Sequence, residues 1–197
     1  MDNIELIKQR LIDSIEVKKG LMKDDDLIST ISLVADNIIE CIQKGGKLVV
    51  CGNGGSASDA LHFVSEIVGK FAMNRNSWPA IALNTNESTM TAIANDYGYD
   101  EVFARQVKGL VRSEDIFVGI STSGKSENVY RAMIAANKIG AKTVGLLGYD
   151  GGKIADVSGY SIIVPSHVTA RVQECHITII HILCEIVEAK LSVWSNE

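Results

Sequence analysis

The sequence predicts a three-layer α/β domain built around a five-stranded parallel sheet. Five short runs rich in β-branched residues alternate along the chain with segments of helical period, which is the pattern of a parallel sheet covered by helices on both faces. The chain has 197 residues, of which 46% are hydrophobic and only 2 are prolines, so it suits one globular domain with a sizeable core. Sheets of this kind bind ligands at the carboxyl ends of their strands.

The elements follow from the spacing of apolar residues, taken in chain order. Apolar residues recur at helical spacing from Ile4 to about Lys19 and from about Leu27 to Gln43, which predicts two opening amphipathic helices. We expect the strands in the runs GGKLVVCG, AIALN, DIFVGIS, KTVGLLG and YSIIVPS, each bounded by turn residues. Helical period predicts the remaining helices near Ser56–Val68, Ser88–Val111, Glu127–Ile139, Lys153–Val157 and Thr169–Leu191.

The sequence shows no linker, low-complexity tract or internal repeat, so residues 1–197 are expected to form one domain. Residues 1–44 supply the N-terminal helices and residues 45–197 supply the α/β core. The opening helices precede the first strand, so their apolar faces pack either on another subunit or back onto the domain. We favour oligomerisation, because the long closing helix is also more apolar than a single buried face requires.

Composition excludes several classes of partner. A net charge of −5 and a pI near 5.4 argue against capture of nucleic acid, which needs a basic face. The four cysteines form no CxxC pair and lie in apolar segments, so we expect reduced core residues. The N-terminus lacks the apolar centre of a signal peptide, and no apolar run approaches the length of a membrane span. These features predict a cytoplasmic protein.

The stretch VVCGNGGSASDALHFVSEIVGK contains a glycine-rich turn between a strand and a helix. Gly52, Gly54 and Ala57 fit the G-x-G-x-x-G/A spacing of a dinucleotide-binding turn, but the next strand ends in Asn84 where that site needs an acid. The turn also lacks the Gly-Lys-Ser/Thr ending of a Walker loop. A purely structural tight turn is the simplest alternative. A functional site is favoured because a second polar turn follows the third strand at the same edge of the sheet.

That second turn, STSGKS, is rich in hydroxyl groups and opens a helix. Hydroxyls and free backbone N–H groups at a helix N-terminus attract anions, and a sugar monophosphate is the more natural guest because the turn lacks the lysine-ended loop of a nucleotide site. Ordinary N-capping by Ser126 is the alternative. The hydroxyl-bearing residues of this candidate phosphate site are Ser121, Thr122, Ser123 and Ser126.

A candidate metal site comes from two helices. His62 and Glu66 lie four residues apart, so both project from one face of the helix that follows the glycine turn. Gln173 and His181 lie on the closing helix, eight residues apart, which separates them by about 12 Å along the axis. Either one metal lies between their levels, or one of the two ligands comes from a neighbouring subunit. His167 and His176 have no such partner and are assigned structural roles.

Five segments together resemble a known family. CGNGGSASDALHFVSEIVGKF, TAIANDYG, GISTSGKSENV, YDGGKIADV and ARVQECHITIIHILCEIVE are similar, in this order and over nearly the whole chain, to the phosphoheptose isomerases of the sugar isomerase (SIS) superfamily. The resemblance implies a flavodoxin-like αβα domain in a homotetramer with active sites between subunits. It further implies isomerisation of sedoheptulose 7-phosphate to glycero-manno-heptose 7-phosphate, the first step towards nucleotide-activated heptose for lipopolysaccharide, capsule or surface-layer glycans.

Site residues are carried over motif by motif. The resemblance implies that the turn of Ser121, Thr122 and Ser123 with Ser126 holds the phosphate. It implies one zinc ion per subunit, bound by His62, Glu66, Gln173 and His181, with Glu66 and His181 as the acid–base pair. Glu66 and Gln173 are also expected to contact the substrate, together with the residues that line the sugar, which are Asn53, Gly54, Gly55, Asn95 and Asp96.

The residue types suit an enediol mechanism, which needs a base for a carbon-bound proton, an acid to return it and a donor for the oxyanion. We expect Glu66 to move the carbon proton and His181 to serve the oxygens. A carboxylate that binds zinc is a weaker base, so either Glu66 leaves the metal during turnover or the metal is mainly structural.

Two alternative functions stay open from the sequence. One is a non-catalytic SIS-domain relative that associates with the replication initiator; Glu66 and His181, which that relative lacks, favour the enzyme. The other is isomerisation of a pentose or hexulose phosphate.

Overall fold

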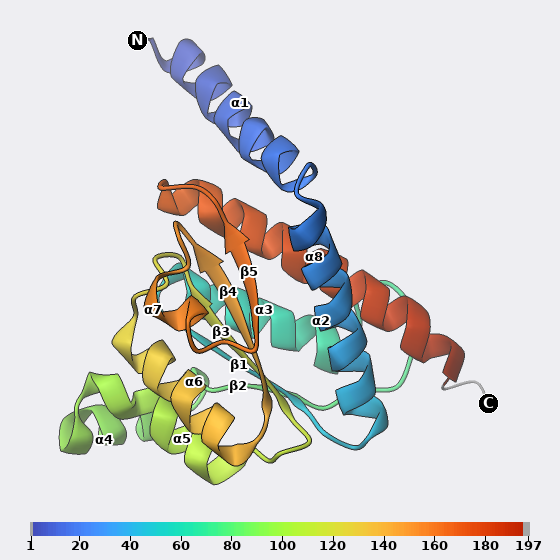
Figure 1. The fold of residues 1–197 in the computed structure, drawn as a ribbon, viewed down its shortest axis with the longest axis vertical. Helices are drawn as coiled ribbons and strands as arrows, with labels where there is room; N and C mark the ends of the chain where they lie inside the picture. The colour runs from blue at the N-terminus through green and yellow to red at the C-terminus, as the bar shows by residue number, and fades with distance from the viewer. Residues whose placement is uncertain (1, 195–197) are drawn as a thin grey trace.

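The computed structural model describes residues 2–194, and the chain forms the predicted five-stranded sheet (Figure 1). All strand pairs are parallel, and the strand order is β2-β1-β3-β4-β5. The order reverses beside β1, which is where open α/β sheets bind ligands at the carboxyl ends of their strands. The strands are β1 (Leu48–Gly52), β2 (Ala80–Ala82), β3 (Ile116–Ser121), β4 (Lys142–Gly148) and β5 (Tyr160–Val164).

The register places the two polar turns side by side. In the pairing of β1 with β3, Gly52 lies opposite Ile120, so both strands end at the same level. The glycine-rich turn and the hydroxyl-rich turn therefore leave the sheet as neighbours, as the sequence predicted. Every residue of β1 and β3 is buried, which explains why these strands read as continuous apolar runs.

Helices cover both faces of the sheet, each over its own apolar cluster. Alternation along β3 shows the division, because Ile116 and Val118 belong to the cluster under α2, α3 and α8, whereas Phe117 belongs to the cluster under α5 and α6. The helices of the first layer are α2 (Asp25–Gln43), α3 (Gly55–Val68) and α8 (Thr169–Trp194). The helices on the other side are α4 (Glu87–Tyr97), α5 (Val102–Leu110), α6 (Glu127–Ile139) and α7 (Gly152–Ala155).

One predicted helix is wrong in its extent. The period from Ser88 to Val111 predicted a single helix, but the chain forms α4 and α5 with a short 3-10 turn between them. The break falls at Gly98, whose φ of 87° cannot continue a right-handed helix. A glycine inside a helical pattern was the available signal for this C-terminal cap.

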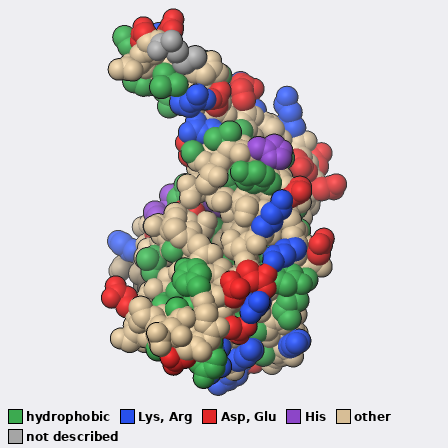
Figure 2. Space-filling model, turned by 90° about the vertical axis from the view of Figure 1, so that its left-hand side faces the viewer, with side chains coloured by type: hydrophobic (Ala, Val, Ile, Leu, Met, Phe, Trp, Pro, Cys, Tyr) green, Lys and Arg blue, Asp and Glu red, His purple; other side chains and the backbone are tan. Residues whose placement is uncertain are grey.

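The two opening helices behave differently. The buried face of α2 packs into the core beside α8 and the sheet, so this helix folds back onto the domain. By contrast α1 (Asn3–Leu21) extends away from the body (Figures 1 and 2). Its only buried residue is Leu21. Its side chains Ile4, Ile7 and Leu11 are each at least 60% exposed, which leaves an apolar face without cover in the single chain.

Cysteines and helix lengths agree with the sequence predictions. All four cysteines are unpaired and buried, as expected for reduced core residues. Across residues 2–194, no helix combines the length and the apolar character needed to cross a bilayer.

His176 provides a test of the core by pH. This side chain is fully buried, its Nε2 donates to the carbonyl of Leu147 at 2.9 Å, and burial lowers its pKa from 6.5 to about 4. In the unfolded chain His176 is protonated below pH 6.5, whereas in the folded chain it is protonated only below about pH 4. We therefore expect His176 to lower the free energy of unfolding by about 2 kcal/mol as the pH falls from 7 to 4.5.

Urea unfolding across this pH range measures the effect. His176→Gln keeps a donor for the Leu147 carbonyl but cannot titrate, so its stability should depend less steeply on pH than that of the parent chain. Parallel pH profiles for the two proteins would show that His176 does not carry the acid sensitivity.

Candidate active site

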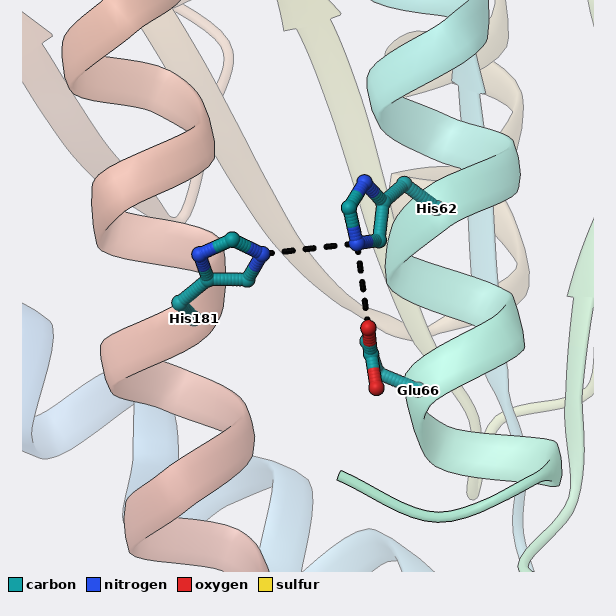
Figure 3. A group of neighbouring side chains, drawn as sticks. All are labelled: His62, Glu66 and His181. Carbon is teal, nitrogen blue, oxygen red and sulfur yellow. Dashed lines mark hydrogen bonds and ion pairs between the residues drawn. The ribbon is translucent and has the colours of Figure 1, made fainter. Parts of the chain in front are cut away.

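Three side chains from two helices meet beside the sheet. His62 and Glu66 project from α3, one turn apart, and His181 projects toward them from α8 (Figure 3). His62 Nε2 lies 3.0 Å from Glu66 Oε1 and 3.4 Å from His181 Nε2. The three potential ligand atoms all lie within 4.8 Å of one another. All three groups therefore belong to one subunit, and the cluster needs no residue from a neighbour to form.

The donor set fits a divalent metal ion. Tetrahedral zinc with bonds of about 2.0–2.2 Å places neighbouring ligand atoms roughly 3.4 Å apart, close to the two separations around His62 Nε2. Two imidazoles and a carboxylate also match the nitrogen and oxygen ligands that zinc accepts. The side chain of His62 is 44% exposed and that of Glu66 is 20% exposed, so the cluster is open to a small molecule.

Gln173 lies near this cluster but on a different level. It lines a hollow of about 310 Å³ together with His62. Its amide packs so close to Gly55 that a Cβ at that position would lie 2.1 Å from Gln173 Nε2. Gly55 therefore leaves room for this side chain. The hollow extends from the start of α3 to His62 and so joins the glycine-rich turn to the histidine cluster.

Asp59 is a further acid in this hollow and is not among the predicted site residues. It lies one turn before His62 on α3, and its Oδ2 is buried with no hydrogen-bond partner among the described residues. Burial raises the pKa of Asp59 to about 6, and the nearby His62 opposes the shift. The three-residue spacing to His62 on a helix was the signal that could have found it.

The glycine-rich turn is fixed by amide pairs. Asn53 and Asn128 exchange two side-chain hydrogen bonds of 2.8 and 2.9 Å, and Tyr99 Oη donates to Asn53 Oδ1 at 3.1 Å. Asn128 lies in the first turn of α6, so this pair joins the glycine-rich turn to the hydroxyl-rich one. At the end of β2, Asn84 donates to the carbonyl of Gly52 at 2.8 Å, where a dinucleotide site would need a free acid.

The hydroxyl-rich turn brings two serine hydroxyls together at the start of α6. Ser126 is the N-cap residue of α6 but makes no side-chain capping bond; its Oγ lies 3.0 Å from Ser121 Oγ. Ser123 Oγ accepts from the backbone N–H of Lys125 at 3.2 Å. Ser126 therefore occupies the N-cap position that the capping alternative gave it, but its hydroxyl pairs with Ser121 and not with a backbone N–H. The hydroxyls of this turn lie at a helix N-terminus, where backbone N–H groups favour an anion.

The remaining predicted site residues, Asn95 and Asp96, lie on α4, away from the histidine cluster. Asn95 Nδ2 donates to Asp96 Oδ1 at 2.8 Å, and both side chains are exposed on α4. This helix packs against the layer of α5 and α6, whereas the histidine cluster lies in the layer of α3 and α8. A single chain does not bring Asn95 and Asp96 to the cluster.

Comparison with known proteins gives a consistent family. The SIS domain family matches residues 17–148. A phosphoheptose isomerase of Geotalea daltonii is 48% identical over 188 residues, which cover 95% of this chain and 97% of that protein. A phosphoheptose isomerase of a Nitratiruptor species is 55% identical over 150 residues, or 76% of this chain and 80% of that protein.

Solved structures agree in fold. A phosphoheptose isomerase from Francisella tularensis superposes with a TM-score of 0.92 at 36% identity, covering 96% of this chain and all of the other. One from Neisseria gonorrhoeae gives a TM-score of 0.88 at 40% identity, covering 95% of this chain. These relatives do not favour the alternative of a non-catalytic protein that associates with the replication initiator. Identity of this extent, together with the matching fold, shows that the chain belongs to the phosphoheptose isomerases of the SIS family.

Proposed function

We propose that this protein is an aldose–ketose isomerase that converts D-sedoheptulose 7-phosphate to D-glycero-D-manno-heptose 7-phosphate through an enediol. The observation that carries this proposal is the meeting of Glu66 with two imidazoles at one end of the hollow that begins at the glycine-rich turn. A carboxylate and imidazoles within reach of one small molecule are the groups that proton transfer next to a carbonyl requires. The product would enter synthesis of nucleotide-activated heptose for surface glycans.

The substrate would lie along the two turns and the hollow. Ser121, Thr122, Ser123 and Ser126 hold the phosphate, supported by the free N–H groups at the start of α6. The sugar hydroxyls are contacted by Asn53, Gly54 and Gly55, and Gln173 borders the same space. Asn95 and Asp96 of a neighbouring subunit complete the sugar site, because α4 does not reach the cluster of its own chain.

Proton transfer then falls to two residues. The Glu66 carboxylate removes a proton from C1 of the ketose and returns it to C2, and the electron pair moves through the enediol from one carbon to the other. His181 exchanges protons with O2 and O1 as the carbonyl moves between them. Asp59, next to His62, offers a further carboxyl group at the wall of the hollow.

The metal expected here is zinc, one ion per subunit. Its ligands would be His62, Glu66 and His181, which already meet, with Gln173, which lines the hollow beside His62, as the fourth. A bound zinc ion supplies Lewis-acid polarisation of the substrate carbonyl. We place the protein in the cytoplasm.

Conversion of the substrate tests the proposed reaction. Purified protein incubated with sedoheptulose 7-phosphate, with and without added zinc, should form an aldoheptose phosphate whose C1 proton is seen by NMR. In D₂O the product should carry deuterium at C2, which reports the enediol. Ribulose 5-phosphate and fructose 6-phosphate serve as comparison substrates and should react far more slowly. No turnover of the heptulose phosphate under either condition would leave only a ligand-binding role.

The exposed face of α1 supports assembly into a homotetramer. A hollow of about 540 Å³ lies between α1 and α8, lined by Leu6, Ile7 and Leu11, and a second copy of the chain is proposed to cover it. Replacing Ile7 and Leu11 together with glutamate should lower the mass measured by light scattering, because charges would be buried in the interface. Lys8→Glu, also exposed on α1, is the matched control. Equal masses for both variants would show that α1 does not hold the assembly together.

A further inference from the structure

A buried ion pair fastens the loop after α3 to α8. The side chains of Arg75 and Glu188 are only 2% and 3% exposed, and Arg75 Nε lies 2.9 Å from Glu188 Oε1. Glu188 also accepts from three successive backbone N–H groups, those of Phe71, Ala72 and Met73, at 2.7–2.9 Å. Burial opposes ionisation of Glu188, but these donors outweigh it and hold its pKa below the usual value. The carboxylate is therefore charged at neutral pH and fully paired.

The other end of Arg75 caps α3. Its Nη2 donates to the carbonyl of Glu66 at 2.7 Å, and its Nη1 donates to the carbonyl of Ile67 at 3.0 Å. These are among the last carbonyls of α3, which have no partner inside the helix and attract a cation. The guanidinium also stacks on Trp78, 3.6 Å from the ring centroid, so its plane is fixed.

The pair connects the two halves of the histidine cluster. His181 and Glu188 lie seven residues apart on α8, which is two turns, or about 10 Å along the axis on nearly the same side. Arg75, in the loop after α3, donates to the backbone carbonyl of Glu66 near the end of that helix. Phe71, held by Glu188, brings its ring to 5.8 Å from the ring of His181. One ion pair therefore fixes the last turn of α3 against the side of α8 that carries His181.

We infer that Arg75 and Glu188 are positioning residues that hold Glu66 at its working distance from His181. This inference rests on the proposed function of that cluster. Arg75 acts through the backbone carbonyl of Glu66, to which its side chain donates, and Glu188 acts through Phe71, whose ring lies beside His181. Loss of the pair should loosen the packing of α3 against α8 and so weaken both zinc binding and proton transfer. The hydroxyl-rich turn belongs to other elements and should keep its contacts.

Glu188→Gln and Arg75→Lys test the inference. Glutamine places an NH₂ group near the backbone N–H donors, and lysine keeps the charge but has no fork to reach two carbonyls. Zinc affinity of the purified full-length chain, measured by competition with a chromophoric chelator, should fall about 10- to 100-fold, as for other residues that orient metal ligands. In sugar-phosphate kinetics, kcat should fall and KM should change little.

Asp115→Asn is the matched control. Asp115 is 2% exposed, pairs with Lys47 Nζ at 2.6 Å and accepts from two backbone N–H groups, but it lies at the amino end of the sheet. Removing that pair should lower stability without changing zinc affinity or kcat at a temperature where the protein is folded. Zinc affinity and kcat of both test variants within about twofold of the control would overturn the inference. If Glu188→Gln does not fold, Arg75→Lys alone decides.

The design separates this inference from the proposed reaction, because zinc titration involves no sugar. A parent chain that binds zinc but leaves sedoheptulose 7-phosphate unchanged would refute the reaction, and the affinities of the variants would still decide the positioning role. A parent chain that turns over substrate but binds no zinc leaves the decision to kcat and KM. A parent chain that does neither would overturn both.

Discussion

Glu66→Gln should lower kcat by about 10³-fold, because an amide cannot accept the proton that a carboxylate removes from carbon. The side chain keeps its volume and one oxygen near His62, so the fold and much of the metal site should remain. Turnover of sedoheptulose 7-phosphate and exchange of deuterium into the sugar should fall together, since both need the same proton transfer. Zinc affinity is measured in parallel, to separate loss of the base from loss of the metal.

Glu114→Gln is the control for this change, because Glu114 is exposed in the turn before β3 and its carboxylate accepts from its neighbour Ser113. Its kinetics should match those of the parent chain. If metal-free enzyme keeps activity that Glu66→Gln abolishes, the carboxylate is the base and the metal is mainly structural. A kcat of Glu66→Gln within about threefold of the control would show that Glu66 is not the base that removes the carbon-bound proton.

Gly124→Ala should damage both stability and phosphate binding. Gly124 has a φ of +65°, which side chains rarely adopt, and a Cβ there would lie 2.0 Å from the carbonyl oxygen of Gly151. The hydroxyl-rich turn thus packs backbone to backbone against the loop after β4. The carbonyl of Gly124 also accepts from the N–H of Ile154 in α7 at 3.1 Å. Positive φ and the clash together should cost about 2–5 kcal/mol.

Urea unfolding measures this loss, and the KM for the sugar phosphate should rise because the serine hydroxyls no longer converge. Gly109→Ala is the matched control: Gly109 lies in α5, and a Cβ there meets nothing within 4 Å. That change should stabilise by up to about 1 kcal/mol, as expected for alanine inside a helix. If Gly124→Ala matched Gly109→Ala in stability and KM, the close packing of this turn would have no importance.

Most of the fold could be predicted from the sequence, because its signals are local. Each strand is a short β-branched run that ends at a glycine or a polar turn, and buried parallel strands need no more than that. The exception at Gly98 shows the limit of periodicity. Apolar spacing continues from α4 into α5, but one positive φ ends the first helix.

Part of the candidate site could be predicted as well. His62 and Glu66 share a helix face by spacing alone, and the two polar turns follow adjacent strands. Spacing on α8 could not decide whether Gln173 or His181 joins them, because that depends on how α8 is rotated against α3. Asp59 and Asn128 were missed: Asp59 carries only its three-residue spacing to His62, and Asn128 is an amide with no pattern of its own.

The sequence by itself determined the parallel sheet, the positions of the two polar turns and the family, because each depends on residues close together in the chain. Only the tertiary structure decided that His181 meets His62 across 119 positions and that Glu188 reaches Arg75 across 113. Those contacts depend on the packing of α8 against α3, which is set by the whole apolar layer beneath both helices. Helical period predicts which residues share a face of a helix, but only the tertiary packing decides which residues that face contacts.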